Sequence, residues 1–274
     1  MSIVSKIWNS SPKAVVQAVA NKLAGTKPSP SWTKVTSGPF ENGQLYIDIG
    51  SFVGWQEMAS GNFDAFIYKE LGDADLTGAV VWDIGAHFGY HSFSFASLVG
   101  DSGHVYAFEP NPFNGKRFKI HMEKNPVQAK RITLNPIALS DANGQTMFVF
   151  SEDVDGSSSS GSHLESAIVP LAAGTYAKFK HETVECLTID SFIATTGARI
   201  PQFMKIDVEG AEMMVLRGGK EFFAQHRPVI FMEVHNIVLM YAVHAFFIGI
   251  GYSVKMLDEE NSTLSKCFIV ARPQ

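Results

Sequence analysis

From residue 80 onward, short apolar blocks alternate with longer segments of helical periodicity. The blocks that read as strands are AVVWDI, HVYAFEP, ITLNPIAL, TMFVF, TVECLTI, QFMKIDV and PVIFMEV. Helices are predicted over 90–99 and 112–124, from Ala211 onward, and over the apolar stretch 237–251. Strands that take turns with helices indicate a parallel sheet wrapped by helices.

The last apolar blocks, YSVKML and KCFIVAR, are separated by the turn-forming stretch DEENS. This spacing predicts a hairpin, so the sheet should finish with an antiparallel strand. The apolar stretch 237–251 is short for a bilayer and contains His244, which predicts a buried helix and no membrane span.

The first 60 residues follow a different pattern. Val15, Val16, Val19 and Leu23 recur at helical spacing, which predicts an amphipathic helix over 11–24 that serves as a lid or a packing arm. The stretch KPSPS then breaks the regularity, and alternating apolar residues predict a half-buried strand ending in YIDIG. We therefore divide the chain into an extension, residues 1–60, and one domain, residues 61–274.

Composition narrows the classes of function. With 274 residues and 46% hydrophobic content, the chain can build a substantial core. A formal charge of -5 disfavours a sequence-independent grip on phosphate backbones, so we expect no nucleic-acid partner. Cys186 and Cys267 lie far apart inside apolar runs, which predicts buried thiols in a reducing compartment. With no recognisable signal peptide, we expect a cytoplasmic protein, and the sequence leaves a homo-oligomer open.

The pattern Asp-Ile-Gly-x-x-x-Gly occurs twice, in YIDIGSFVGWQ at 46–56 and in VWDIGAHFGYHSF at 81–93. A nucleotide-binding loop needs a buried strand, a glycine turn, a helix start and an acid about 20 residues further on. The first copy lacks a clear downstream helix and a suitable acid. We therefore interpret Asp48 and Gly50 as residues of a tight turn.

The second copy has every part that a nucleotide-binding loop needs. Gly85 and Gly89 bracket the turn, and Glu109 closes the next strand. The middle glycine of a dinucleotide fingerprint is missing, because His87 stands in its place. Asp83, two residues before the first glycine, would repel a phosphate and would suit a cationic cofactor such as S-adenosylmethionine. The loop therefore points to methyl transfer.

The stretch from about 60 to 235 resembles the FkbM-type family of S-adenosylmethionine-dependent methyltransferases. The matching pieces are GNFD, VVWDIGAHFGYHSF, YAFEPNP, NPIALSD, GSSSSGSHL, LTIDSF, FMKIDVEGAEMMVLRGG and PVIFMEVH. KIDVEGAE followed by EVH is the most specific part. The resemblance implies an α/β, Rossmann-like class I methyltransferase fold, a mostly parallel seven-stranded sheet with its last strand antiparallel and helices on both faces. Many members are linked to O-methylation of sugars or of polyketide-like natural products.

The resemblance also implies which residues bind the cofactor. Glu109 would take both ribose hydroxyls, residues 138–141 would border the adenine, and Asp207 would lie under the methionine portion. Asp64 stands where the family often has a glutamate for the cofactor's amino group. The full set implied by the resemblance is Asp64, Asp83, Gly85, His87, Phe88, Gly89, Glu109, Pro110, Asn111, Ala138, Ser140 and Asp141.

Methyl transfer to an alcohol also requires a group that removes the hydroxyl proton. The candidates at the ends of two neighbouring strands are Asp207, Glu209, Glu233 and His235. His235 is preferred, with Glu233 or Asp207 as its partner, because an ordinary imidazole titrates near neutrality. Two alternatives stay open: Glu233 and His235 as a purely structural pair, and Asp207, Glu209 and Glu233 as ligands of a divalent cation that acidifies a diol.

Other polar residues receive structural interpretations. His91 and His244 are expected to pack on apolar helices, Lys205 to be a solvated or ion-paired strand residue, and Glu212 to be either a helix-capping charge or a functional one. The serine-rich segment 155–163 is interpreted as a connector or as a loop that closes over the acceptor.

We therefore predict an S-adenosylmethionine-dependent O-methyltransferase that acts on a small hydroxylated acceptor, a sugar or a secondary metabolite. Three alternatives remain open: an N-methyltransferase acting on a small amine, a nicotinamide-dependent oxidoreductase, and a non-catalytic module that binds the cofactor.

Overall fold

The computed structural model describes residues 29–50, 53–72, 75–151, 162–167, 179–257, 262–263 and 266–274. The helix predicted over 11–24 lies outside the described residues, as does the serine-rich segment apart from Ser162 and His163.

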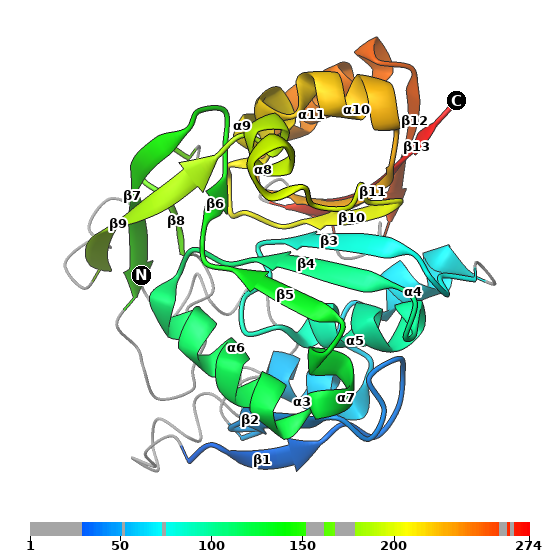
Figure 1. Cartoon of the computed structure of the whole chain (residues 1–274), viewed down its shortest axis with the longest axis vertical. Coiled ribbons are helices and arrows are strands. Elements are labelled where there is room, and N and C mark those ends of the chain that lie inside the picture. Colours follow the sequence, from blue (N-terminus) through cyan, green and yellow to red (C-terminus); the bar gives the residue numbers. More distant parts are fainter. Residues whose placement is uncertain are drawn as a thin grey trace.

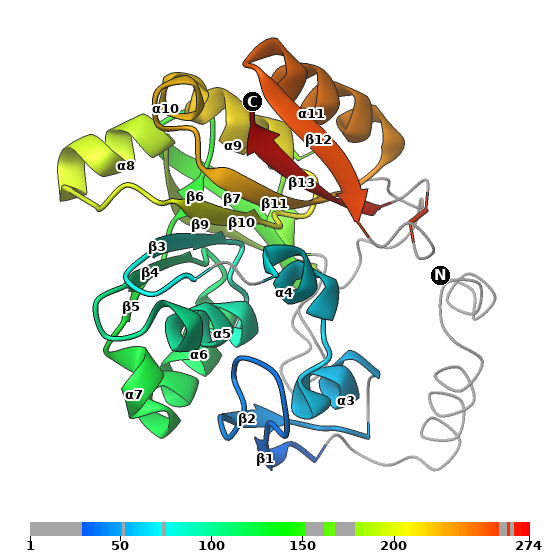
Figure 2. The ribbon, with the colours of Figure 1, turned by 90° about the vertical axis from the view of Figure 1, so that its right-hand side faces the viewer.

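Seven strands form the central sheet, shown in Figures 1 and 2. In spatial order they are β12 (Tyr252–Leu257), β13 (Cys267–Pro273), β11 (Val229–Val234), β10 (Phe203–Ile206), β3 (Val80–Ile84), β4 (His104–Phe108) and β5 (Ile132–Asn135). Only β13 runs antiparallel to its neighbours, β11 and β12. The mostly parallel seven-stranded sheet, its antiparallel last strand and the terminal hairpin are confirmed.

Helices cover both faces of this sheet (Figure 2). One face carries α4 (Ala65–Leu71), α5 (Tyr90–Val99), α6 (Pro112–Lys124) and α7 (Pro126–Ala129), and the other carries α8 (Ile189–Thr196), α9 (Glu212–Gly218), α10 (Lys220–His226) and α11 (Ile237–Gly249). Successive side chains of a strand point to opposite faces, so Val81 joins one core and Trp82 the other. The two cores hold the helices against the sheet.

The region before the main sheet packs into the core beneath α5. It contains the antiparallel pair β1 (Ser31–Lys34) and β2 (Gln44–Ile47), followed by α3 (Val53–Ser60). Leu45 and Trp55 are buried in the same hydrophobic cluster as Phe93 of α5. Helix α3 corrects the expectation that the first glycine turn lacks a downstream helix. It is short and buries only Gly54, Trp55 and Met58, so no long apolar stripe announces it.

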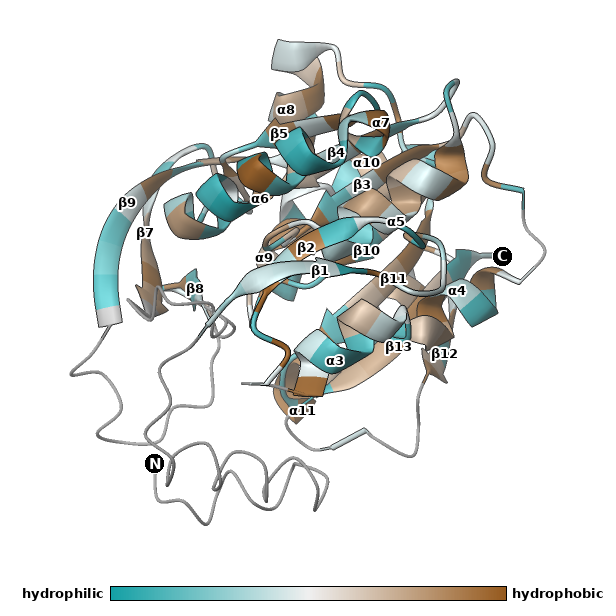
Figure 3. Cartoon of the chain, turned by 90° about the horizontal axis from the view of Figure 1, so that it is seen from below, coloured by the Kyte–Doolittle hydropathy of each residue, from teal (hydrophilic) through white to brown (hydrophobic). Residues whose placement is uncertain are grey.

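A second sheet of four strands was not anticipated. Its order is β6 (Ala138–Leu139), β9 (Phe179–Leu187), β7 (Gly144–Ser151) and β8 (His163–Leu164). The block ITLNPIAL, predicted as one strand, divides between the two sheets at Pro136, which has no N–H to continue a ladder. Figure 3 shows β9 mostly in hydrophilic colours and β7 with hydrophobic ones.

Helix α11 is apolar on nearly all sides, yet only one of its faces is buried. Leu239, Val243 and Phe247 pack against the sheet, whereas Val238 and Tyr241 are exposed. The prediction of a buried helix was therefore wrong in part, because an apolar composition does not show how many faces are covered. Among the described residues, no helix is long and apolar enough to cross a membrane.

Candidate active site

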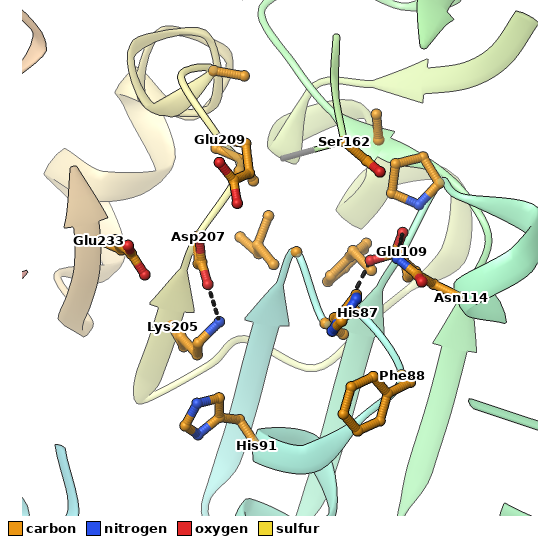
Figure 4. Close-up of a pocket in the computed structure, with 18 of the residues that line it drawn as sticks. His87, Phe88, His91, Glu109, Asn114, Ser162, Lys205, Asp207, Glu209 and Glu233 are labelled. Carbon is orange, nitrogen blue, oxygen red and sulfur yellow. Dashed lines mark hydrogen bonds and ion pairs between the residues drawn. The ribbon is translucent and has the colours of Figure 1, made fainter. Parts of the chain in front are cut away.

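A cavity of about 380 Å³ lies beyond the carboxyl ends of β3, β4 and β10, where open α/β sheets bind ligands (Figure 4). Its floor and walls are formed by the turns that follow these strands, by α3 and by the second sheet. The polar side chains that line it are His87, His91, Glu109, Asn114, Ser162, Lys205, Asp207, Glu209, Glu233 and Lys266.

The glycine turn after β3 brings this strand close to β10. Gly85 has a φ of 81°, and a Cβ added there would lie 1.7 Å from the carbonyl oxygen of Asp207. No other residue fits this close approach. His87 adopts the left-handed conformation without being a glycine, with a φ of 55°. Its backbone N–H donates to the Oε2 atom of Glu109 at 2.7 Å, which ties the turn to the end of β4.

Glu109 is buried in the wall of the cavity. Besides the bond from His87, its carboxylate accepts hydrogen bonds from the backbone of Asn111 at 2.9 Å and from the side chain of Asn114 at 3.3 Å. Burial raises the pKa of Glu109 to about 7, although these hydrogen bonds act in the opposite direction. The carboxyl group therefore gains from any ligand that donates further hydrogen bonds to its ionised form.

The side chain of His87 is neutral. Burial and, to a smaller extent, the nearby Arg117 guanidinium lower its pKa to about 3. Arg117 itself lies over the ring of Phe88, 4.8 Å from the centroid. The turn thus presents aromatic surface and an uncharged imidazole to the cavity, so it does not repel a cationic ligand.

Nine of the sixteen predicted site residues line the cavity, and seven do not. The seven are Asp64, Asp83, Gly89, Asn111, Ser140, Asp141 and His235. Asn111 caps α6 and Gly89 precedes α5, so each fixes the start of a helix beside the cavity without lining the cavity itself. Because the chain turns away after β6, the carboxylate of Asp141 pairs with Arg217 at 3.0 Å instead of facing the cavity. The carbonyl of Ser140 packs closely against Gly218 of α9.

Asp83 requires a correction to the charge argument made from the sequence. Its side chain is fully buried, accepts a hydrogen bond from Ser92 Oγ at 2.5 Å, and lies 3.7 Å from the Nζ atom of Lys205. A neighbouring cation thus offsets this carboxylate, which does not face the cavity. Lys205 is ion-paired, as expected, but it is buried and not solvated.

His91 lines the cavity, although its apolar helix predicts a packing role. Its Nε2 atom lies 3.1 Å from the Asp64 carboxylate, and its Nδ1 atom lies 2.8 Å from the hydroxyl of Tyr68. The contact of Asp64 is therefore with His91 and not directly with the cavity. The sequence signal that was available is the position of His91 in the first turn of the helix that follows the glycine loop.

His235 lies behind the carboxylates of the cavity and is surrounded by them. Its Nδ1 atom donates to Glu212 at 2.7 Å, while its Nε2 atom lies 3.4 Å from Glu209, 3.5 Å from Glu233 and 3.9 Å from Asp207. Burial lowers the pKa of His235, but the hydrogen bonds to Glu212 and Glu233 and the charges of Glu209 and Asp207 outweigh it and raise the pKa to about 11. A pKa in this range favours a protonated imidazole at neutral pH and argues against His235 as the base, an assignment that stays a prediction.

Two lysines complete this cluster. Lys266, a residue that the sequence did not single out, has its Nζ atom 2.7 Å from Glu233, and Lys205 lies 3.2 Å from Asp207. Among the described residues, the cluster therefore contains more carboxylates than cations. The five carboxylates are Asp83, Asp207, Glu209, Glu212 and Glu233, and the three cations are Lys205, Lys266 and His235. The excess of negative charge favours a cationic ligand at this end of the cavity.

The same cluster contains a donor set of the kind that holds metal ions. One atom each from Asp207, Glu233 and His235 lies within 4.8 Å of the others. Hard divalent cations prefer such carboxylate oxygens, so the alternative of a cation stays a prediction for this site.

Comparisons with known proteins find a curated relative and a solved structure that resemble this chain. The hexuronic acid methyltransferase AglP of Haloferax volcanii is 28% identical over 161 residues, which cover 57% of this chain and 56% of that protein. The chain thus spans little more than half the length of this relative. The crystal structure of an FkbM methyltransferase from Methylobacillus flagellatus KT matches with a TM-score of 0.50 and 16% identity, over 70% of this chain and 43% of that one.

The structural match concerns the fold, which is the Rossmann-like fold of class I methyltransferases, as predicted. The family assignment depends on a separate finding. The model of the FkbM methyltransferase domain matches residues 83–253, from the end of β3 through the start of β12, and so includes both the glycine turn and the carboxylate cluster. Because this match covers more than half of the sequence, the chain belongs to the FkbM methyltransferase family.

Proposed function

We propose that this protein transfers the methyl group of S-adenosylmethionine to a hydroxyl group of a small acceptor, with sugars as the first class to test. The observation that carries the proposal is Glu109. It is a buried carboxylate in the cavity wall, held by two backbone N–H groups at the end of β4, with a pKa raised to about 7. Such a group fits a pair of ribose hydroxyls.

The rest of the cavity fits the two ends of this cofactor. Apolar side chains from the end of β4 and from the segment around β6, namely Phe108, Ile137 and Leu139, line the cavity beside Glu109 and suit an adenine ring. At the other end the acidic excess suits a cation. S-Adenosylmethionine supplies a methyl group on a positively charged sulfur, which leaves as a neutral thioether.

The hydroxyl proton passes, in this proposal, to a carboxylate and not to His235. As the acceptor oxygen bonds to the methyl carbon it acquires positive charge, and its proton becomes acidic enough for a carboxylate to accept. We assign this role to Glu209, which lines the cavity and whose side chain is 34% exposed, against 27% for Asp207 and 10% for Glu233. Glu209 has a φ of 51°, a strained conformation of the kind that collects at functional sites.

His235 then acts as a positioning residue. Its imidazolium lies within 3.9 Å of three of the carboxylates that line the cavity, Asp207, Glu209 and Glu233, and reduces their mutual repulsion. Buried Glu212, which also accepts a hydrogen bond from the backbone of Gly210, fixes the orientation of the ring.

A sugar acceptor is supported by the name of the relative, a hexuronic acid methyltransferase, at low identity. The test is to incubate the purified protein with S-adenosylmethionine carrying a labelled methyl group and with matched panels of sugars, uronic acids and amines. We expect label on a hydroxyl oxygen and its loss in Glu209→Gln. Transfer to amines alone would contradict O-methylation, and an oxidised acceptor formed with a nicotinamide cofactor would favour the oxidoreductase.

A divalent cation is the second candidate feature, favoured by the spacing of Asp207, Glu233 and His235. Asp207 and Glu233 would hold it through their carboxylates, and His235 would bind it only after losing its proton. The cation would lower the pKa of a bound hydroxyl. Activity that a chelator abolishes and Mg²⁺ restores would support it, whereas activity unchanged by the chelator would exclude it.

A further inference from the structure

The amino-acid end of S-adenosylmethionine carries an ammonium group and a carboxylate, so its site needs charges of both signs. The carboxylate cluster accounts for the ammonium group and the sulfonium. We propose that Lys205 binds the carboxylate of the methionine moiety. This inference rests on the proposed function and names a cofactor-binding residue that the sequence motifs do not include.

Lys205 lies in a position from which it can reach a bound cofactor. It lies on β10, at the centre of the sheet and next to the glycine turn after β3, and it is 4% exposed while lining the cavity. Figure 4 shows Lys205 with Asp207 on one side of the cavity and Glu109 with Asn114 on the other. A ligand with its ribose on Glu109 would therefore extend its far end toward Lys205.

The ammonium group of Lys205 has more N–H donors than its protein partners use. An ammonium has three N–H donors. Among the described residues, Lys205 makes one hydrogen bond, to Asp207 at 3.2 Å, and its distance of 3.7 Å to Asp83 is too long for another. Its buried ammonium can therefore still donate hydrogen bonds to a ligand.

Lys205 differs from the other basic side chains that line the cavity in the described part of the chain. Lys266 is held by Glu233 at 2.7 Å, and its side chain is 50% exposed. Both ring nitrogens of His91 have partners, and His87 is neutral because burial lowers its pKa. Lys205 is the buried cation that can reach a ligand carboxylate.

The inference also explains the burial of Asp83. Its carboxylate lies 3.7 Å from the Lys205 ammonium, and that of Asp207 lies 3.2 Å from it, so two negative charges hold the lysine in the wall of the cavity. If the lysine were neutral, the two carboxylates would repel a ligand carboxylate. Asp83 would thus assist the cofactor through Lys205.

The test compares ligands that differ in the relevant group. Calorimetry would measure the affinity of S-adenosylmethionine, of decarboxylated S-adenosylmethionine and of 5′-methylthioadenosine, which lacks the amino-acid part. A charge-assisted hydrogen bond in a buried site predicts that the wild-type protein prefers the carboxylate-bearing compound by roughly 10- to 100-fold. Lys205→Met should abolish this preference and leave the affinity for 5′-methylthioadenosine within about twofold, as expected for an unchanged nucleoside site.

Three further variants keep the test decisive. Lys266→Met, which removes the other lysine of the cavity, should keep the preference. If Lys205→Met does not fold because it leaves two buried carboxylates, the double variant Asp83→Asn/Lys205→Met removes one of them and should fold and lack the preference, while Lys205→Arg should retain it.

The outcomes separate this inference from the proposed function. A wild-type protein that binds 5′-methylthioadenosine but shows no preference for the carboxylate would overturn the inference alone. The same holds if Lys205→Met retains the preference. Failure of the wild-type protein to bind any of the three compounds would overturn the proposed function.

Discussion

Cofactor binding should depend strongly on pH because of the environment of Glu109. In the free protein, burial raises the pKa of this carboxyl to about 7. Ribose hydroxyls donate hydrogen bonds to the ionised form, so binding should require loss of the proton. The perturbation is therefore pH itself, with Glu109→Gln as the variant in which this proton is absent.

The size of the effect follows from the pKa. At pH 5.5 about 3% of Glu109 is ionised, and at pH 8 nearly all of it is, so the apparent affinity for S-adenosylhomocysteine should rise roughly 30-fold over this range. The stability of the free protein should change in the opposite direction. The folded state holds this proton more tightly than the unfolded state, whose ordinary value is 4.5, so stability falls as pH rises from 4.5 through 7. At about 1.4 kcal/mol per factor of ten, the loss amounts to about 3 kcal/mol.

Isothermal titration calorimetry in buffers of different ionisation enthalpy measures both the affinity and the released proton. The wild-type protein should release about half a proton at pH 7. Glu109→Gln should bind with little dependence on pH, and Glu123→Gln, an exposed residue of α6, should behave like the wild type. An affinity that stays constant from pH 5.5 to 8 in the wild-type protein would refute the reasoning.

Two further predictions concern the scaffold of the site. Gly85→Ala should destabilise the fold by about 3 kcal/mol or more, because the added Cβ would overlap the Asp207 carbonyl. Gly115→Ala is the control, because no atom lies within 4 Å of its added Cβ, and it should be neutral or stabilising by up to about 1 kcal/mol. Equal melting temperatures for the two variants would contradict the close approach. The contribution of the His235 proton to the free energy of unfolding should be full below pH 6.5 and lost as pH rises toward 11. In denaturant titrations, His235→Gln should therefore lower the free energy of unfolding by about 3–5 kcal/mol at pH 7 and by less at pH 11. An equal loss at both pH values would count against the buried imidazolium.

The repeating part of the fold could be predicted because its signals are local. Helices α5 and α6 occupy the predicted residues, since glycine or proline begins each one and the apolar blocks before them are buried on both faces of the sheet. The division of ITLNPIAL between two sheets could not be read from periodicity. Both halves are apolar, and the outcome depends on the pairing of Ala138 with the distant Cys186.

The site shows the same division between local and distant signals. Gly85 and Glu109 line the cavity where motif spacing places them, and their contact with the cofactor stays a prediction. The ion pairs of Asp83 and His235 depend on partners from other strands and turns, Lys205 for one and Glu212 for the other. Sequence reasoning assigns His235 its ordinary pKa, and burial among several charges is what changes it.

The most direct measurement is a crystal structure of the protein with S-adenosylhomocysteine. The account predicts that both ribose hydroxyls donate to Glu109 and that the sulfur faces the side of the cavity formed by Asp207 and Glu209. A compound bound elsewhere, or a cavity that stays without it at millimolar concentrations, would contradict the account.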